Sequence, residues 1–254
     1  MNYKRSKYYT TSKKRKIKYF FMNNKSKITI VFFHGFMSDM IGAKPKTLQN
    51  YCKRQKLNYL RFEYSGHGKS SGKFIEGNIS KWTDDAKQLI KAKLSKSKNL
   101  IFIGSSMGSW IALNLLPLFK NNVKGFLGIS SAPEFLQELM WKNFSKKIKK
   151  DILQKKIYNL NHGNFTYPLT KQLIWDGKKN KIFNKKTNIR IPVVLFHSIK
   201  DKVVPVKFSR KILKVCSNSK SKLIKIKNGD HSLSRKSDLK KICREINNLI
   251  INCI

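Results

Sequence analysis

The stretch that most restricts the fold of this chain is an apolar run at residues 100–103 that ends in the sequence G-x-S-x-G at residues 104–108. A second apolar stretch at residues 110–113 follows, with a pattern typical of a helix. A serine between a buried strand and a helix occupies a tight, strained turn, so its neighbours must be small. The pattern therefore predicts a strand, a sharp turn that exposes the Ser106 hydroxyl, and a helix.

Strand-like apolar runs recur along the chain and alternate with helical patterns. Such alternation favours a mostly parallel central sheet with helices on both faces, which is the architecture of an α/β protein. Residues 8–21 fit a short antiparallel edge of that sheet. We expect the other strands at about residues 28–33, 58–64, 99–105, 123–130, 191–197 and 222–227.

Two further residues are candidates for catalysis together with Ser106. Asp201 follows the apolar run that starts at residue 191, and His231 follows the run at residues 222–227. The order serine, acid, histidine is the order found in α/β-hydrolases. Asp230 is an alternative acid, but side chains of adjacent residues point in different directions, so we favour Asp201. In this interpretation His231 is the general base for Ser106, and Asp201 orients the imidazole.

A loop after another strand-like run, at residues 34–36, could stabilise a developing negative charge. In this type of site one backbone N–H of that loop and the N–H after the nucleophile form the oxyanion hole. We therefore predict that the N–H groups of Phe36 and Met107 form it. Such chemistry needs no cofactor, and we expect no cofactor and no metal. The remaining histidines are expected to be structural or solvent-facing, and they are His34, His67, His162 and His197.

Four stretches carry a resemblance to a known family, namely residues 35–44, 61–72, 81–82 and 104–110. Through them the chain resembles serine hydrolases of the α/β-hydrolase superfamily, and within it the mitochondrial palmitoyl-protein thioesterase and acyl-glucuronide hydrolase group. The resemblance covers most of residues 27–250. It implies an α/β-hydrolase fold with a helical lid insertion, and hydrolysis of an acyl thioester that could carry a long-chain S-acyl group. Two positions where that group usually has glycine hold Ser109 and Ser198.

The segment at residues 133–188 matches that family poorly and is rich in aromatic residues. We expect a single domain over residues 1–254, with residues 133–188 as a lid or cap insertion. Apolar side chains at helical spacing in this segment allow two interpretations. They could form a pair of helices that packs on the body, or a cap with an apolar slot above Ser106. The two interpretations are compatible.

Charge is the unusual property of the composition. Lysine and arginine total 55 against 13 acidic residues, which gives a formal net charge of +42. Arginine contributes only 8 of the 55, and the lysines are scattered along the chain without a recognisable nucleic-acid module. Enrichment in Lys, Asn and Ile is typical of AT-rich coding. We therefore expect weak association with polyanions or anionic surfaces, and no specific nucleic-acid partner.

The cysteines and the apolar segments of the sequence indicate the cellular compartment. Cys52, Cys216, Cys243 and Cys253 lack metal-ligand spacing and are expected to be reduced thiols. No apolar segment follows the basic N-terminal residues, and no run approaches a membrane span, so we expect a cytoplasmic protein.

The predicted function is a serine hydrolase that cleaves carboxylic esters or thioesters. Its substrate would be a small-molecule ester, an acyl thioester or an S-acylated protein. The alternative is a non-catalytic protein of the same fold that binds polyanions or anionic membrane surfaces.

Overall fold

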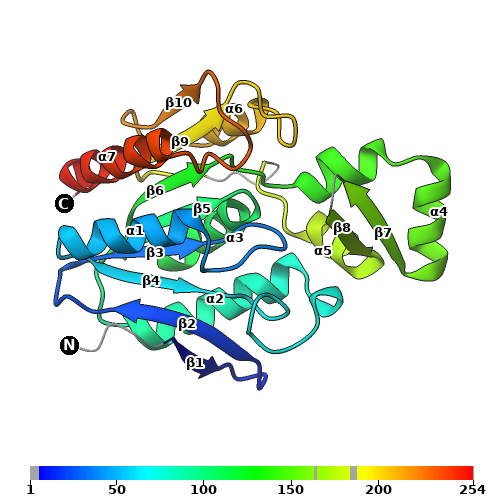
Figure 1. The fold of residues 1–254 in the computed structure, drawn as a ribbon, viewed down its shortest axis with the longest axis horizontal. Coiled ribbons are helices and arrows are strands. Elements are labelled where there is room, and N and C mark those ends of the chain that lie inside the picture. Colours follow the sequence, from blue (N-terminus) through cyan, green and yellow to red (C-terminus); the bar gives the residue numbers. More distant parts are fainter. Residues whose placement is uncertain (1–5, 163–164, 184–187, 254) are drawn as a thin grey trace.

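A computed structural model describes residues 6–162, 165–183 and 188–253 of the chain. Its central feature is an eight-stranded sheet in the order β1-β2-β4-β3-β5-β6-β9-β10 (Figure 1). Neighbouring strands from β4 to β10 are parallel, whereas β2 is antiparallel to both β1 and β4. The strands are β1 (Lys7–Thr10), β2 (Lys16–Met22), β3 (Ile28–Phe33), β4 (Asn58–Phe62), β5 (Asn99–Ser105), β6 (Val123–Ile129), β9 (Val193–Ser198) and β10 (Lys222–Ile226).

These strands confirm the predicted α/β architecture and the short antiparallel edge, although several ends differ from the predicted ones. The run predicted from residue 191 becomes strand β9 only at Val193. Pro192 lies just before it, because proline has no N–H to give to a sheet ladder. The central strands read as unbroken apolar runs because helices cover both faces of the sheet.

Helices on the two faces of the sheet bury separate apolar clusters. One cluster contains residues of α1 (Ala43–Arg54) and α7 (Lys236–Cys253), such as Leu48 and Ile246. The other contains residues of α2 (Ile79–Leu94), α3 (Met107–Leu115) and α6 (Lys207–Lys214). Short 3₁₀ turns lie at Phe74–Glu76 and Leu116–Phe119. No helix in residues 6–162, 165–183 and 188–253 is long and apolar enough to cross a membrane.

The chain between β6 and β9, which we call the insertion, differs from the predicted helical lid. It does contain helices, α4 (Lys146–Lys155) and α5 (Lys171–Lys179). Between them, however, lies an antiparallel ribbon of β7 (Ile157–His162) and β8 (Phe165–Thr170). The residues before α4, whose apolar spacing predicted a helix, form a π-helical turn at Leu136–Met140 and a 3₁₀ turn at Trp141–Asn143. Figure 1 shows α4, β7 and β8 standing beyond one end of the main sheet.

One carboxylate joins the two ends of the insertion. Glu134 lies just after β6, with a positive φ of 59°, and is buried. Its Oε1 accepts hydrogen bonds from the backbone N–H groups of Ile182 at 2.7 Å and Phe183 at 2.8 Å. The segment that leaves the sheet is therefore fastened to the segment that returns to it.

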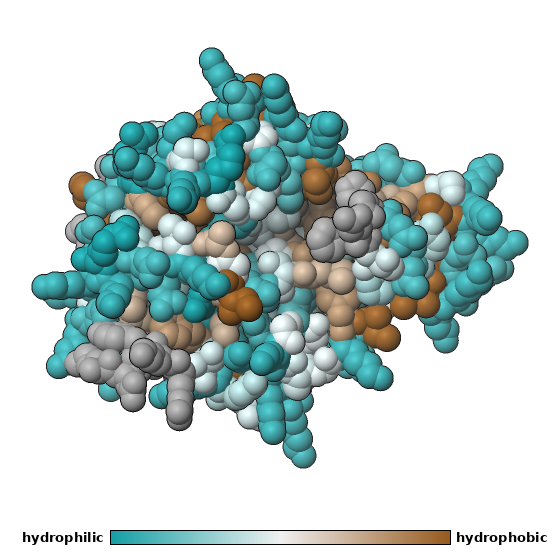
Figure 2. All heavy atoms as spheres, in the orientation of Figure 1, coloured by the Kyte–Doolittle hydropathy of each residue, from teal (hydrophilic) through white to brown (hydrophobic). Residues whose placement is uncertain are grey.

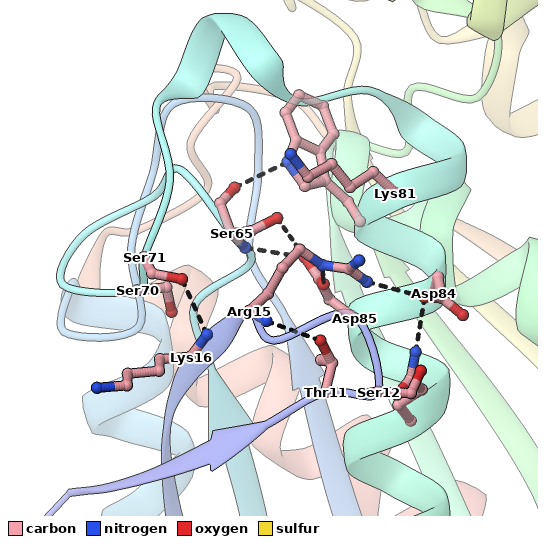
Figure 3. Close-up of polar contacts among 12 residues, drawn as sticks. Thr11, Ser12, Arg15, Lys16, Ser65, Ser70, Ser71, Lys81, Asp84 and Asp85 are labelled. Carbon is pink, nitrogen blue, oxygen red and sulfur yellow. Dashed lines mark hydrogen bonds and ion pairs between the residues drawn. The ribbon is translucent and has the colours of Figure 1, made fainter.

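A buried ion pair fastens the N-terminal edge of the sheet to α2. The Arg15 guanidinium contacts Asp85 at 2.5 Å and Asp84 at 2.8 Å (Figure 3). The other oxygen of Asp85 accepts hydrogen bonds from the backbone N–H and the hydroxyl of Ser65. The indole N–H of Trp82 donates to the Ser65 carbonyl at 3.0 Å. These contacts hold the loop after β4 against α2, so we call them the Asp85 network.

The face of the molecule drawn in Figure 2 is mostly hydrophilic. Hydrophilic side chains cover both the sheet body and the insertion on this face, and do not gather in one patch.

Cys52, Cys216 and Cys243 carry free thiols. Burial raises the pKa of Cys216 to about 12, so it is a poor nucleophile. The side chains of Cys253 and His162 lie outside the described residues.

Candidate active site

Ser106 occupies the strained turn that the sequence predicts between β5 and α3. Its φ of 51° and ψ of −117° lie in a region that L-residues rarely adopt, which costs about 1–3 kcal/mol. The flanking glycines are required because backbone segments pass very close. A Cβ on Gly104 would lie 2.4 Å from the Ser109 Cα, and one on Gly108 would lie 2.2 Å from the Phe33 carbonyl oxygen. The Ser106 N–H donates to the Ile129 carbonyl at 2.9 Å, which helps to hold the turn.

The three residues predicted for catalysis form one hydrogen-bonded series. The Ser106 Oγ lies 3.1 Å from the Nε2 of His231, and the Nδ1 of His231 lies 2.8 Å from an Asp201 carboxylate oxygen. A carboxylate only accepts hydrogen bonds, so Nδ1 carries the proton and Nε2 accepts from the serine hydroxyl. The imidazole is therefore placed to take the serine proton. Residues after β5, β9 and β10 meet here because parallel strands bring their carboxyl ends to one edge of the sheet.

Asp201 is held as an anion by its surroundings. Its side chain is fully buried, and its Oδ1 accepts hydrogen bonds from the backbone N–H groups of Val203 at 2.9 Å and Val204 at 2.8 Å. Burial by itself raises the pKa of this carboxyl, but contacts with His197 and His231 and the Val204 N–H outweigh it and lower the pKa well below its usual value. The carboxylate is therefore ionised at neutral pH.

His197 is a member of this group that the sequence interpretation missed. It was expected to be structural or solvent-facing, and it is indeed fully buried. Its Nε2, however, lies 3.3 Å from the Asp201 carboxylate and 2.8 Å from the Val204 carbonyl, so it carries a proton. Its Nδ1 accepts from the Ser209 hydroxyl at 2.7 Å. His197 thus contacts the same carboxylate oxygen of Asp201 that His231 contacts. The signal in the sequence is its place on a buried strand four residues before the acid.

Asp230, the alternative acid, points elsewhere. Its Oδ1 accepts from the backbone N–H of Leu233 at 2.8 Å, within its own turn. In the described part of the chain, no hydrogen bond joins Asp230 to His231. The geometry therefore favours Asp201 as the partner of the imidazole.

The two serines that replace expected glycines both make specific contacts. The Ser109 hydroxyl donates to the Gly104 carbonyl at 2.8 Å, across the turn that holds Ser106. The Ser198 hydroxyl donates to the Gly229 carbonyl at 2.6 Å. It thereby joins the loop of Asp201 to the loop of His231. Both replacements tie together backbone segments that carry the hydrogen-bonded series.

The residues predicted to form the oxyanion hole, Phe36 and Met107, lie near Ser106. Met107 is the first residue of α3, so its N–H has no acceptor within the helix. Gly35, which precedes Phe36, lies against the serine, since a Cβ on it would be 3.5 Å from the Ser106 Cβ. The ring of buried His34 donates to the Gly35 carbonyl at 2.8 Å, which fixes this loop. Burial, with a smaller effect of His67, holds the pKa of His34 well below its usual value, so it remains neutral.

A cavity of about 520 Å³ opens at Ser106 and His231. Its lining contains two groups of residues that differ in chemistry. The insertion supplies an apolar wall, and the segment around the start of α1 together with the turn after His231 supplies polar residues. The wall consists of Phe135, Leu139, Met140, Phe144, Leu160 and Tyr167, and the polar residues include Ser38, Asp39, Lys44, Ser232 and Ser234.

Comparison with known proteins gives a consistent result. The family model described as "Serine aminopeptidase, S33" matches residues 24–173. The mitochondrial palmitoyl-protein thioesterase ABHD10 of Bos taurus is 26% identical over 224 residues, which are 87% of this chain and 72% of that protein. Among solved structures, a protein from Agrobacterium vitis S4 superposes with a TM-score of 0.91 at 26% identity, covering 97% of this chain and 98% of the other. Mouse alpha/beta hydrolase domain-containing protein 10 superposes with a TM-score of 0.88 at 24% identity, covering 98% and 99%.

Proposed function

Because the chain belongs to the serine aminopeptidase S33 family of α/β-hydrolases, and is accordingly a hydrolase, we propose that it cleaves carboxylic esters or thioesters with Ser106 as the nucleophile. The observation that carries the proposal is the hydrogen-bonded series from Ser106 through His231 to Asp201, at a cavity with an apolar wall. A fixed serine, imidazole and carboxylate in this order can perform acyl transfer.

The proposed reaction has two halves. His231 removes the Ser106 proton through Nε2, and the serine oxygen attacks the carbonyl carbon. Asp201 stabilises the imidazolium that forms, while the N–H groups of Phe36 and Met107 stabilise the oxyanion, each by about 3 kcal/mol. His231 then gives its proton to the departing oxygen or sulfur, which leaves an acyl group on Ser106. In the second half, the same imidazole activates water, which releases the acid.

The apolar wall of the insertion supports an acyl chain as the group that stays on Ser106. Leu139, Met140 and Phe144 line this wall, and burial of each methylene of a chain against such residues contributes about 0.8 kcal/mol. The relative in Bos taurus is named a palmitoyl-protein thioesterase, so long-chain S-acyl groups, on small molecules or on proteins, are the first substrates to examine. The reaction requires no cofactor.

The test is turnover of a chain-length series of acyl thioesters and p-nitrophenyl esters by the wild type and by Ser106→Ala. We expect hydrolysis that disappears in the variant, and labelling of Ser106 by a fluorophosphonate. Amino-acid p-nitroanilides in the same assay examine the peptidase activity that the family description names. Absence of both hydrolysis and labelling would contradict the proposal and favour the non-catalytic binder of polyanions.

A further inference from the structure

Phe36, whose backbone N–H is predicted to contribute to the oxyanion hole, lies in a turn with few backbone contacts. His34 holds the Gly35 carbonyl, and the Ser38 N–H closes the turn with a long hydrogen bond of 3.3 Å to the same carbonyl. Met37, the other central residue of the turn, has a positive φ of 49°. Among the residues that the structure describes, none accepts a hydrogen bond from the Phe36 N–H. This N–H is therefore available to an oxyanion, but backbone contacts alone do little to fix its position.

The side chain of Phe36 has the contacts that its backbone lacks. On the body of the molecule its ring lies edge-on to Phe74 and Trp82, with ring centroids 5.0 Å and 6.2 Å away. On the insertion it lies edge-on to Phe135 at 5.4 Å and stacks on Tyr167 at 6.0 Å, with 15° between the stacked planes. Aromatic pairs prefer such arrangements, so these neighbours favour one orientation of the Phe36 ring. Phe36 is thus held between the body and the insertion.

Tyr167 is the contact through which the ribbon of the insertion reaches Phe36. It lies on β8, is half-buried, and lines the cavity that contains Ser106. The chain is fastened close to this point, because the side-chain amide of Gln172, just after β8, donates to the Ile75 carbonyl at 2.8 Å. Ile75 belongs to the same 3₁₀ turn as Phe74. The Tyr167 ring is therefore held in place against the loop of Phe36.

We propose that Tyr167 is a positioning residue for the oxyanion hole, because its ring, stacked on Phe36, holds the Phe36 N–H where a developing oxyanion requires it. The inference rests on the proposed function. It gives the insertion a role in the reaction step in addition to its apolar wall. Small displacements of a donor weaken the stabilisation of a transition state strongly. Since the oxyanion forms in both halves of the proposed reaction, loss of the ring should lower kcat whichever half is slower.

The test compares p-nitrophenyl acetate and p-nitrophenyl octanoate in the wild type, Tyr167→Ala and Tyr167→Phe. The two esters separate positioning from chain binding, because an acetyl group has no chain to lie along the wall. We expect Tyr167→Ala to lower kcat by about tenfold on both esters, with little change in the KM of the acetate. Tyr167→Phe keeps the stacked ring, so its kcat should stay within about twofold of the wild-type value.

A second measurement addresses the oxyanion directly. The ketone 1,1,1-trifluoroacetone adds to a catalytic serine and forms an oxyanion without a long chain. Its Ki should therefore rise in Tyr167→Ala by the factor by which kcat/KM of the acetate falls. Tyr158→Ala is the matched control, since Tyr158 is half-buried on the other strand of the ribbon and does not line the cavity. It should keep the wild-type kcat, KM and Ki.

Two results would overturn the inference while leaving the proposed function intact. One is a Tyr167→Ala variant that keeps its kcat on the acetate and only raises the KM of the octanoate, because Tyr167 would then serve the wall alone. The other is an equal loss of kcat in Tyr167→Ala and Tyr158→Ala, because the loss would then reflect general damage to the ribbon. A wild type that hydrolyses neither ester and is not labelled by a fluorophosphonate would instead contradict the proposed function itself.

Discussion

Asp85 and Asp201 are both aspartates with fully buried side chains that are held by nitrogen donors, but their partners differ in kind. Asp85 contacts the guanidinium of Arg15 and the Ser65 hydroxyl, and it joins a strand edge to a helix. Asp201 contacts the imidazoles of His231 and His197. A guanidinium stays charged at every relevant pH, whereas an imidazole can gain and lose a proton near neutrality. The first carboxylate neutralises a permanent charge, and in the proposed reaction the second stabilises a charge that appears only during turnover.

The largest expected effect is on activity, and it distinguishes the contacts of Asp201 from the Asp85 network. Asp201→Asn should lower kcat by about 10⁴-fold, because the amide can no longer stabilise the imidazolium and favours the wrong tautomer. Steady-state kinetics on an acyl thioester measure this loss. Asp230→Asn is the neighbouring control, and it should cost far less because Asp230 bonds to its own turn. An Asp230→Asn variant that loses more activity than Asp201→Asn would mean that the acid is misassigned.

The corresponding test of the Asp85 network concerns stability. Arg15→Met should lower the free energy of unfolding by about 3–5 kcal/mol, since it leaves a buried carboxylate without its cation. Urea unfolding measures the change, and the folded fraction should keep its kcat. Lys87→Met provides the control, because the pair of Lys87 with Asp84 is more exposed and contributes about 0.5 kcal/mol. Equal effects of the two variants would remove the distinction between buried and exposed pairs.

A third prediction concerns how stability depends on pH. It involves His67, which lies beside Ser65 of the Asp85 network. Burial, against a smaller effect of the Ser65 carbonyl, lowers the pKa of His67 from 6.5 to about 4. Between these values the unfolded chain binds a proton that the folded chain does not, so stability falls as the pH falls through this window. The total loss in the free energy of unfolding across this window is about 3 kcal/mol.

His67→Phe removes that contribution, so the variant should lose less stability than the wild type between pH 7 and pH 4. Urea unfolding at the two pH values measures the difference. An identical pH dependence in both proteins would show that His67 does not carry the effect.

The smallest expected effect returns to Asp201. His197→Phe removes one brace of this carboxylate, and kcat should fall by about tenfold with little change in KM. Ser209→Ala, which removes the hydroxyl partner of His197 Nδ1, should give a weaker loss of the same kind. If KM rises while kcat is kept, His197 would act on substrate binding and not on the positioning of Asp201.

The fold and the three meeting residues could be predicted because their signals are local. The strand, turn and helix around Ser106 follow one another in sequence, and the order of Asp201 and His231 places both after parallel strands. The catalytic roles of these residues remain predictions that the kinetic tests address.

Other features depend on contacts that no local pattern encodes. The ribbon of β7 and β8 has no long apolar stripe, and Pro168 lies within it, opposite Asn159. Proline is tolerated there because the ribbon has only two strands and both are edges. The contact of Lys44 with Ser232 joins residues 188 positions apart. Neither the ribbon nor this contact could be read from the spacing of residues along the chain.

The contacts of Glu134 with Ile182 and Phe183 have a consequence for how such a protein can evolve. The Glu134 carboxylate closes the base of the insertion by binding Ile182 and Phe183, and further hydrogen bonds hold α5 against residues 75–80. Ser106, Asp201 and His231, in contrast, all follow strands of the main sheet. The insertion that supplies the apolar wall of the cavity is thus attached apart from the residues of the hydrogen-bonded series. For the proposed reaction, mutations in the insertion, or exchange of the whole insertion, would alter which acyl chains are accepted while the catalytic groups are inherited unchanged.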